Sequence, residues 1–149
     1  MIGWRSAWTE TCLGSLRRVA ILLTLATTAL TLVNAVVADE GRALYLEHCA
    51  SCHGAQLEGQ PDWMTRKPDG RLPAPPHDAS GHTWHHSDRA LITIIRDGLQ
   101  AFAPSYETDM PAFGDRLTDA RILAVVDYLK ESWPEREQAY QRARTETDP

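Results

Sequence analysis

Cysteine is scarce in this sequence, and its scarcity narrows the kinds of site that the chain can build. The 149 residues contain three cysteines, and Cys12 lies upstream of a long apolar run. Only Cys49 and Cys52 remain in the part of the chain that follows this run. A four-cysteine zinc site is excluded, because no second pair of cysteines can complete it. A thioredoxin-like redox pair is disfavoured, because it expects a βαβ pattern that the sequence does not show.

Positive charge is also in short supply. The chain has 15 lysines and arginines against 20 aspartates and glutamates, which gives a formal net charge of -5. Nucleic acid is therefore disfavoured as a partner, because binding to phosphates requires a basic surface. The acidic balance favours protein partners with a basic docking patch, although a negative surface also serves solubility.

One long hydrophobic run is present, and it lies near the N-terminus. Residues 19–38 are largely apolar, and three arginines precede them. A positive segment, an apolar segment and compact residues ending at Ala38 predict a signal peptide over residues 1–38, which would export residues 39–149 to the periplasm. The alternative is an uncleaved membrane anchor, because about 20 apolar residues are enough to cross a bilayer.

The two remaining cysteines stand in the run Cys49-Ala50-Ser51-Cys52-His53. This C-x-x-C-H spacing is the attachment motif for haem c. Two intervening residues on a helical turn bring both thiols within reach of the vinyl groups on one edge of a porphyrin, and the histidine that follows is an iron ligand. The motif predicts one covalently bound haem c, with Cys49 and Cys52 in thioether bonds and His53 on the iron. Both cysteines are then used, so no structural disulfide is left to form.

Several side chains compete for the opposite side of the iron, and Met110 fits this position best. A thioether is a soft, neutral ligand that favours Fe(II). Pro111 biases Met110 towards an extended conformation that can present its side chain. Met64 is disfavoured, because it follows His53 closely in the loop on the wrong side of the motif. The alternatives are that Met110 fills core space, or that a histidine takes its place: His77, His82, His85 or His86.

Residues 54–86 predict a long loop, because their glycines and prolines interrupt any helix. Few large apolar residues lie here, so the bulk of a haem would thicken a thin core. We expect a carbonyl of the stiff proline-rich segment, from Pro75 or Pro76, to accept a hydrogen bond from Nδ1–H of His53. Such a partner fixes the tautomer of a ligating histidine and raises its basicity. The alternative is a plain rigid loop.

Histidines cluster at residues 81–86, which read Gly-His-Thr-Trp-His-His. Together, His82, His85 and His86 suggest a copper or zinc site. The adjacency of the last two histidines, and the lack of a carboxylate pattern around them, favour exposed histidines before a helix instead. Trp84 has an N–H donor that requires a partner when it is buried, and we expect this partner to be a haem propionate.

Three segments carry the signals of helices. A short helix over residues 42–48 leads into the haem motif. Ser87 is a suitable N-cap for a second helix, which Gly98 ends. Thr118 is a suitable N-cap for a third helix, which carries an apolar stripe and ends near Ser132.

The sequence predicts a close helix crossing near the start of this domain and a polar tail after it. Gly41 lacks a side chain and permits a close crossing of the first and third helices, and Tyr45 is expected to be buried at that crossing. Pro134 interrupts the third helix. Residues 135–149 are polar and charged, and they predict a tail with at most a turn or two of helix and a frayed end.

Residues 41–133 resemble a single-haem class I cytochrome c. The resemblance rests on the C-x-x-C-H run, the Gly-x-Thr-Trp segment at 81–84, the Met-Pro pair at 110–111 and a final helix ending Tyr-Leu-Lys at 128–130, in the family's order. It implies a small all-α fold of three to four helices and long loops around one haem. It implies these roles: Cys49 and Cys52 in thioethers, His53 and Met110 as axial ligands, Trp84 on a propionate, and a carbonyl of Pro75 or Pro76 on His53.

The sequence departs from this family in its long loop and in its charge. The stretch between His53 and the proline-rich segment is longer than in mitochondrial-type members, and the histidines at 82–86 are unusual. Lysine-rich members dock through a basic haem edge, so this acidic chain requires a different partner surface.

These expectations combine into an exported bacterial one-electron carrier with a cytochrome c domain over residues 39–134. Two protein ligands leave no open coordination site, so we expect electron transfer at an exposed haem edge and no enzymatic activity. We expect a monomer whose partners are redox proteins. It would be attached to a membrane only if the leader is retained. The alternatives are a cytochrome subunit of a periplasmic oxidoreductase complex, and a haem sensor or peroxidase-like protein with a labile or missing sixth ligand.

Overall fold

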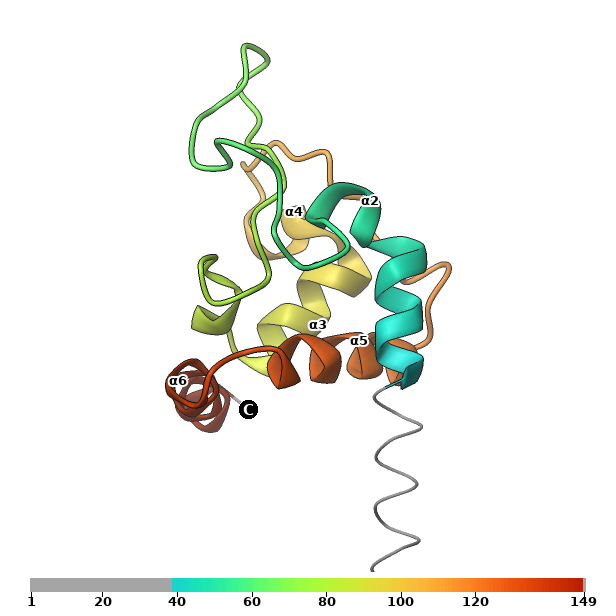
Figure 1. Cartoon of the computed structure of the whole chain (residues 1–149). Coiled ribbons are helices and arrows are strands. Elements are labelled where there is room, and N and C mark those ends of the chain that lie inside the picture. Colours follow the sequence, from blue (N-terminus) through green and yellow to red (C-terminus); the bar gives the residue numbers. More distant parts are fainter. Residues whose placement is uncertain (1–38, 149) are drawn as a thin grey trace, which may run out of the picture. The chain divides into compact units, whose positions relative to one another are not determined.

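A computed structural model describes residues 39–148, and this part of the chain forms helices and loops with no strand. The predicted all-α class is therefore confirmed. The predicted leader, residues 1–38, lies outside the described residues. The elements along the chain are helical residues 39–48, α2 (Ala50–His53), the 3₁₀ helix η1 (Thr83–His85), α3 (Asp88–Asp97), α4 (Leu99–Phe102), α5 (Asp119–Glu131) and α6 (Glu135–Thr147) (Figure 1). Between residues 39 and 148, no helix has the length and hydrophobicity needed to cross a membrane.

The two central helices begin and end where the sequence predicts. The hydroxyl of Ser87 accepts a hydrogen bond from the backbone N–H of Ala90 at 3.2 Å, and this contact caps α3. The hydroxyl of Thr118 accepts one from Arg121 at 3.4 Å and caps α5 in the same way. Gly98 ends α3 with a φ of 86°, in the left-handed region where a glycine costs least.

The core is built where the helical residues 39–48 cross α5. A Cβ on Gly41 would lie 2.1 Å from the carbonyl oxygen of Ala124, so this crossing depends on glycine. Tyr45 is fully buried, and its ring lies 5.4 Å from that of Tyr128. Its hydroxyl donates a hydrogen bond to the carbonyl of Gly54 at 2.7 Å, so the first helix also holds the start of the long loop. The close packing predicted for Gly41 and Tyr45 is confirmed.

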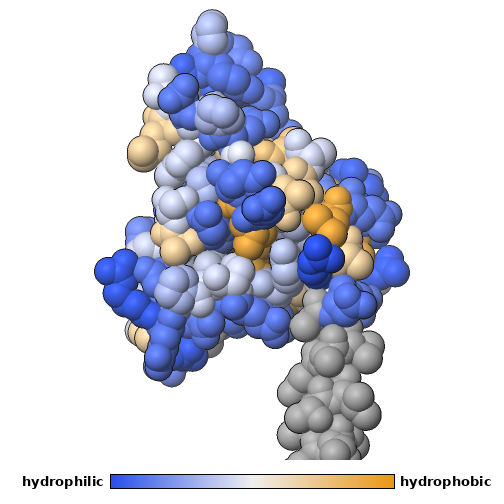
Figure 2. Space-filling view, in the orientation of Figure 1, coloured by the Kyte–Doolittle hydropathy of each residue, from blue (hydrophilic) through white to orange (hydrophobic). Residues whose placement is uncertain are grey.

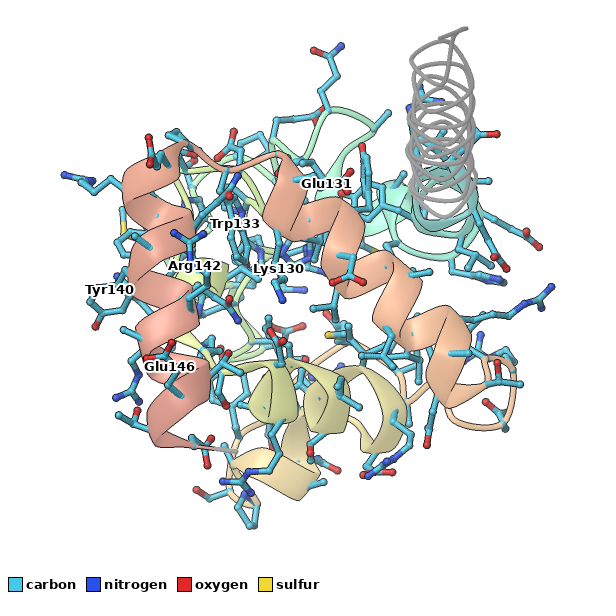
Figure 3. The ribbon with its side chains drawn as sticks, turned by 90° about the horizontal axis from the view of Figure 1, so that it is seen from below. Lys130, Glu131, Trp133, Tyr140, Arg142 and Glu146 are labelled. Carbon is cyan, nitrogen blue, oxygen red and sulfur yellow. The ribbon has the colours of Figure 1, made fainter. Side chains whose placement is uncertain are left out.

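The C-terminal segment corrects the sequence prediction. A polar tail with a frayed end was expected for residues 135–149, but α6 is a regular helix of 13 residues. Gln141 is 1 % exposed, and its side-chain amide donates hydrogen bonds to Asp88 at 2.6 Å and to Thr145 at 3.1 Å. Lys130 of α5 donates to the same Asp88 carboxylate at 2.9 Å and lies in the space between the helices (Figure 3). Polar contacts with Asp88 of α3 therefore hold α6, Lys130 of α5 shares that carboxylate, and an apolar stripe is not needed.

The junction before α6 and the helix itself both contact the segment 77–86. Trp133 is buried, and its indole N–H donates a hydrogen bond to the carbonyl of His77 at 2.7 Å. The ring of Tyr140 packs edge-on against Trp84 of η1, with 5.3 Å between the ring centroids. The segment after α5 therefore fixes the loop that carries several of the candidate site residues.

The long loop between α2 and η1 leaves the helices and returns to them. Its base is closed by backbone hydrogen bonds from Gln60 to Ala74 at 2.9 Å and from His77 to Leu57 at 2.8 Å. Residues 61–73 between these contacts project away from the helices (Figure 1). Figure 2 shows that this projection is largely hydrophilic, whereas hydrophobic residues gather below it in the middle of the same face. Backbone hydrogen bonds thus close the loop at its base.

Candidate functional site

The cysteine motif forms a single helical turn. Cys49 precedes α2, and its carbonyl accepts the backbone N–H of His53 at 2.9 Å. The N–H of Cys49 in turn donates to the carbonyl of Tyr45 at 2.8 Å, so the motif continues from the first helix. Cys49 is half-buried, Cys52 is exposed, and both thiols are free. One turn of helix therefore holds two thiols and an imidazole, as the C-x-x-C-H spacing predicted.

The thiol of Cys49 is not suited to nucleophilic catalysis. The pKa of Cys49 is raised to about 11, mainly by burial and to a smaller extent by the neighbouring Cys52. The thiol therefore stays protonated at neutral pH, whereas a catalytic cysteine requires a depressed pKa. This disfavours a cysteine enzyme as the use of the motif.

The imidazole of His53 is oriented by the proline-rich segment. The side chain is 7 % exposed, and its Nδ1 lies 2.9 Å from the carbonyl oxygen of Pro75. A carbonyl can only accept, so Nδ1 carries the proton and Nε2 keeps its lone pair for a metal. Burial lowers the pKa of His53, and the hydrogen bond to Pro75 offsets part of that shift. The ring is therefore neutral, which is the state that binds a metal.

Of the two prolines predicted to hold His53, Pro75 is the acceptor. The carbonyl of Pro76 faces Gly81, where a Cβ would approach it to 2.0 Å. The hydroxyl of Thr83 also lies 3.5 Å from this carbonyl. Pro76 therefore shapes the turn that leads into η1, and Pro75 contacts the imidazole.

His77 is a site residue that the sequence reasoning placed only among the competing iron ligands. Its ring stacks on that of His53, with 4.0 Å between centroids and 21° between planes. Its Nδ1 lies 2.8 Å from the hydroxyl of Thr83. The pKa of His77 is lowered well below its usual range, mainly by burial and to a smaller extent by the nearby His53, so the ring is neutral. Stacking this close leaves no room for a porphyrin between the rings, so His77 is not presented as the opposite axial ligand. Its position directly after the two prolines was the available signal.

Met110 is half-buried and packs against the hydrophobic core. Its backbone N–H donates a hydrogen bond to the hydroxyl of Thr108 at 3.0 Å. The competing methionine, Met64, is 76 % exposed in the projecting loop. This exposure disfavours Met64 as an iron ligand, whereas packing against the core agrees with both predicted roles of Met110, so its ligation of the iron stays a prediction.

The histidine rings of residues 82–86 pack against different neighbouring residues. His82 stacks on Trp63, with 5.6 Å between centroids, and meets His86 edge-on at the same separation. His85 instead packs against Trp84, with 3.8 Å between centroids. No group of three His, Cys, Asp or Glu side chains suited to a metal ion is found in the part of the chain described. The copper or zinc site considered from the sequence therefore gains no support.

Trp84 has a partner within its own turn. Its indole N–H donates a hydrogen bond to the carbonyl of Gly81 at 3.1 Å. The side chain is half-buried and lies against the core. The hydrogen bond from Trp84 to a haem propionate stays a prediction.

These residues fit a haem c. The donor set consists of two free thiols on one helical turn and a neutral imidazole with Nε2 available. Hydrophobic side chains that are only partly buried come from the motif, η1, α3 and the loop before α5, and a porphyrin would cover such surface. These side chains are Cys49, Ala50, Trp84, Ile92, Ile95 and Met110.

A family model supports this interpretation. The model described as "Cytochrome C oxidase, cbb3-type, subunit III" matches residues 36–129. The match includes the cysteine motif, Pro75, Trp84 and Met110, and it ends before α6. No curated protein and no solved structure shows significant similarity to the chain.

Proposed function

The chain belongs to the family described as cytochrome c oxidase, cbb3-type, subunit III, and from this membership we propose that it is a periplasmic one-electron carrier with a single haem c. Family membership implies that haem c is bound covalently. The observation that best supports our assignment of the ligands is the contact between His53 and Pro75. It fixes Nδ1 as the protonated nitrogen and leaves Nε2 for iron, one residue after the second thiol.

Each residue of the site has a separate role in this proposal. When bound, haem c supplies the one-electron step, because its iron alternates between Fe(III) and Fe(II). Cys49 and Cys52 would hold the porphyrin edge through thioethers. His53 would provide Nε2, and the carbonyl of Pro75 keeps that imidazole in the correct tautomer. Met110 would provide a neutral thioether, which raises the reduction potential.

Two axial ligands from the protein would leave no open coordination position. We therefore propose a carrier of the single-haem class I type without enzymatic activity. We also propose that this carrier acts as a monomer. Bacteria attach haem c outside the cytoplasm, and this agrees with the export predicted from residues 1–38.

The family description gives reason for a second candidate, a cytochrome subunit of an oxidoreductase complex. A free C-terminal arm for docking would have supported it, but α6 uses its buried face on its own domain through Gln141 and Asp88. The complex would therefore have to form through another surface. Purification of the native protein distinguishes the two candidates, since a carrier runs as a single polypeptide and a subunit elutes with its partners.

We expect a potentiometric titration of the matured holoprotein to follow a one-electron Nernst curve, with one haem per chain. With both axial positions filled as proposed, the ferrous protein should not bind carbon monoxide at a measurable rate. Rapid binding of carbon monoxide would contradict the carrier and favour a haem sensor. More than one haem per chain would contradict the single-haem assignment.

A further inference from the structure

We propose that Lys67 and Arg71 act as a strap that positions the Met110 loop through Asp109, and so slows the departure of Met110 from the iron. This inference rests on the proposed role of Met110 as an axial ligand. It gives a role to the projecting loop, which is one of the features in which the chain departs from the family that the sequence resembles.

The strap consists of two ion pairs to one carboxylate. Lys67 Nζ lies 2.6 Å from Oδ2 of Asp109, and Arg71 Nη1 lies 2.6 Å from Oδ1. Each oxygen therefore has its own cation. The paired residues are 42 and 38 positions apart in the sequence, and Asp109 directly precedes Met110. Two long-range contacts thus converge on the residue next to the proposed ligand.

The turn at residues 66–71 is built to present both cations. Lys67 donates a backbone hydrogen bond to Arg71 at 2.8 Å, and Gly70 donates one to Lys67 at 2.9 Å. The carboxylate of Asp69 accepts the N–H of Arg71 at 3.0 Å, and the guanidinium of Arg66 donates to the carbonyl of Gly70 at 2.6 Å. Lys67 and Arg71 are therefore held on one closed turn, and they do not reach Asp109 as two independent side chains.

A further contact joins the same two segments. The guanidinium of Arg66 lies 5.8 Å from the centroid of the Tyr106 ring, a cation–π distance. The second half of the ligand loop is held differently, because Phe113 and Gly114 donate backbone hydrogen bonds to the end of α3 at 2.9 Å each. The strap therefore anchors the first half of the loop, and α3 anchors the second half.

The expected effect is local. Lys67, Arg71 and Asp109 keep 37 %, 42 % and 49 % of their side-chain surface exposed. Ion pairs this exposed contribute little to global stability. They nevertheless restrict a loop that has no helix between α4 and α5. Breaking them should free the Met110 loop without unfolding the domain.

The test measures how fast imidazole displaces the native ligand in the ferric holoprotein. Asp109→Asn removes the charge but keeps the shape, and we expect imidazole to bind about three- to tenfold faster, since two exposed ion pairs are lost. Lys67→Gln combined with Arg71→Gln should give the same increase. Salt at about 1 M should raise the wild-type rate towards that of the variants, because it screens exposed charges.

The matched control is Asp127→Asn, which breaks the ion pair between this exposed carboxylate and Lys130 on α5. It should bind imidazole at the wild-type rate. Methionine ligation of ferric haem gives a weak far-red absorption band from sulfur-to-iron charge transfer. The strap is overturned if Asp109→Asn binds imidazole no faster than Asp127→Asn while both variants keep this band. A wild-type spectrum without that band instead overturns the Met110 assignment, and with it the strap, so the two failures are distinguished.

Discussion

Replacement of Cys49 and Cys52 together by alanine is expected to give a polypeptide with no covalently bound haem and little stable structure. The two thiols lie on one helical turn and are free for thioether bonds. Without them, the half-buried hydrophobic side chains around the site lose the group that would cover them. The free energy of unfolding of a small domain is only about 5–15 kcal/mol, so losing a large apolar body can remove most of it.

A haem stain of the denatured protein on a gel, together with circular dichroism, would check this result. The matched control is Ser51→Ala, which lies between the two cysteines and keeps both thiols. It should stain and fold like the wild type. A double cysteine variant that still retains haem after denaturation would contradict covalent attachment at these positions.

Gly41→Ala is expected to lower the stability of the domain strongly. The added Cβ would lie 2.1 Å from the carbonyl oxygen of Ala124 and 3.0 Å from the Cβ of Tyr128, so the first helix and α5 would have to separate. Overpacking of this kind costs about 1–3 kcal/mol, and more where backbone atoms are the obstacle. Alanine recovers about 1 kcal/mol of helix propensity. We expect a net loss of about 2 kcal/mol.

Thermal unfolding of the holoprotein measures this loss. For a domain of this size, about 2 kcal/mol corresponds to a fall in Tm of roughly 8 °C or more. Arg42→Ala is the control, because it changes the neighbouring exposed residue of the same helix. An unchanged Tm for Gly41→Ala would show that the crossing tolerates a side chain.

Local signals in the sequence were sufficient for the features that depend on neighbouring residues. The caps Ser87 and Thr118 act within their own helical turns, so the two helices could be placed from the sequence. The C-x-x-C-H motif is equally local. The acceptor for His53 could be narrowed to two adjacent prolines, because a stiff segment limits which carbonyls are available, and the structure selects Pro75.

Features held by distant polar contacts were not visible in the sequence. α6 is held partly by Gln141, which bonds to Asp88 from 53 residues away, and no apolar stripe marks that contact. The stacking of His77 on His53 joins residues on opposite sides of a long loop. The pairing of Asp109 with Lys67 likewise depends on how that loop folds back. Sequence reasoning detects periodicity and short motifs, whereas these contacts have neither.

The most direct test of the central claim is the optical spectrum of the oxidised holoprotein, with Met110→Ala beside the wild type. If His53 and Met110 hold the iron, the wild type should show the weak far-red band of sulfur-to-iron charge transfer, and the variant should lose it. A wild type without the band, or a variant that keeps it, would contradict Met110 ligation. The proposal of a high-potential electron carrier would then give way to a low-potential relay or a ligand-binding haem.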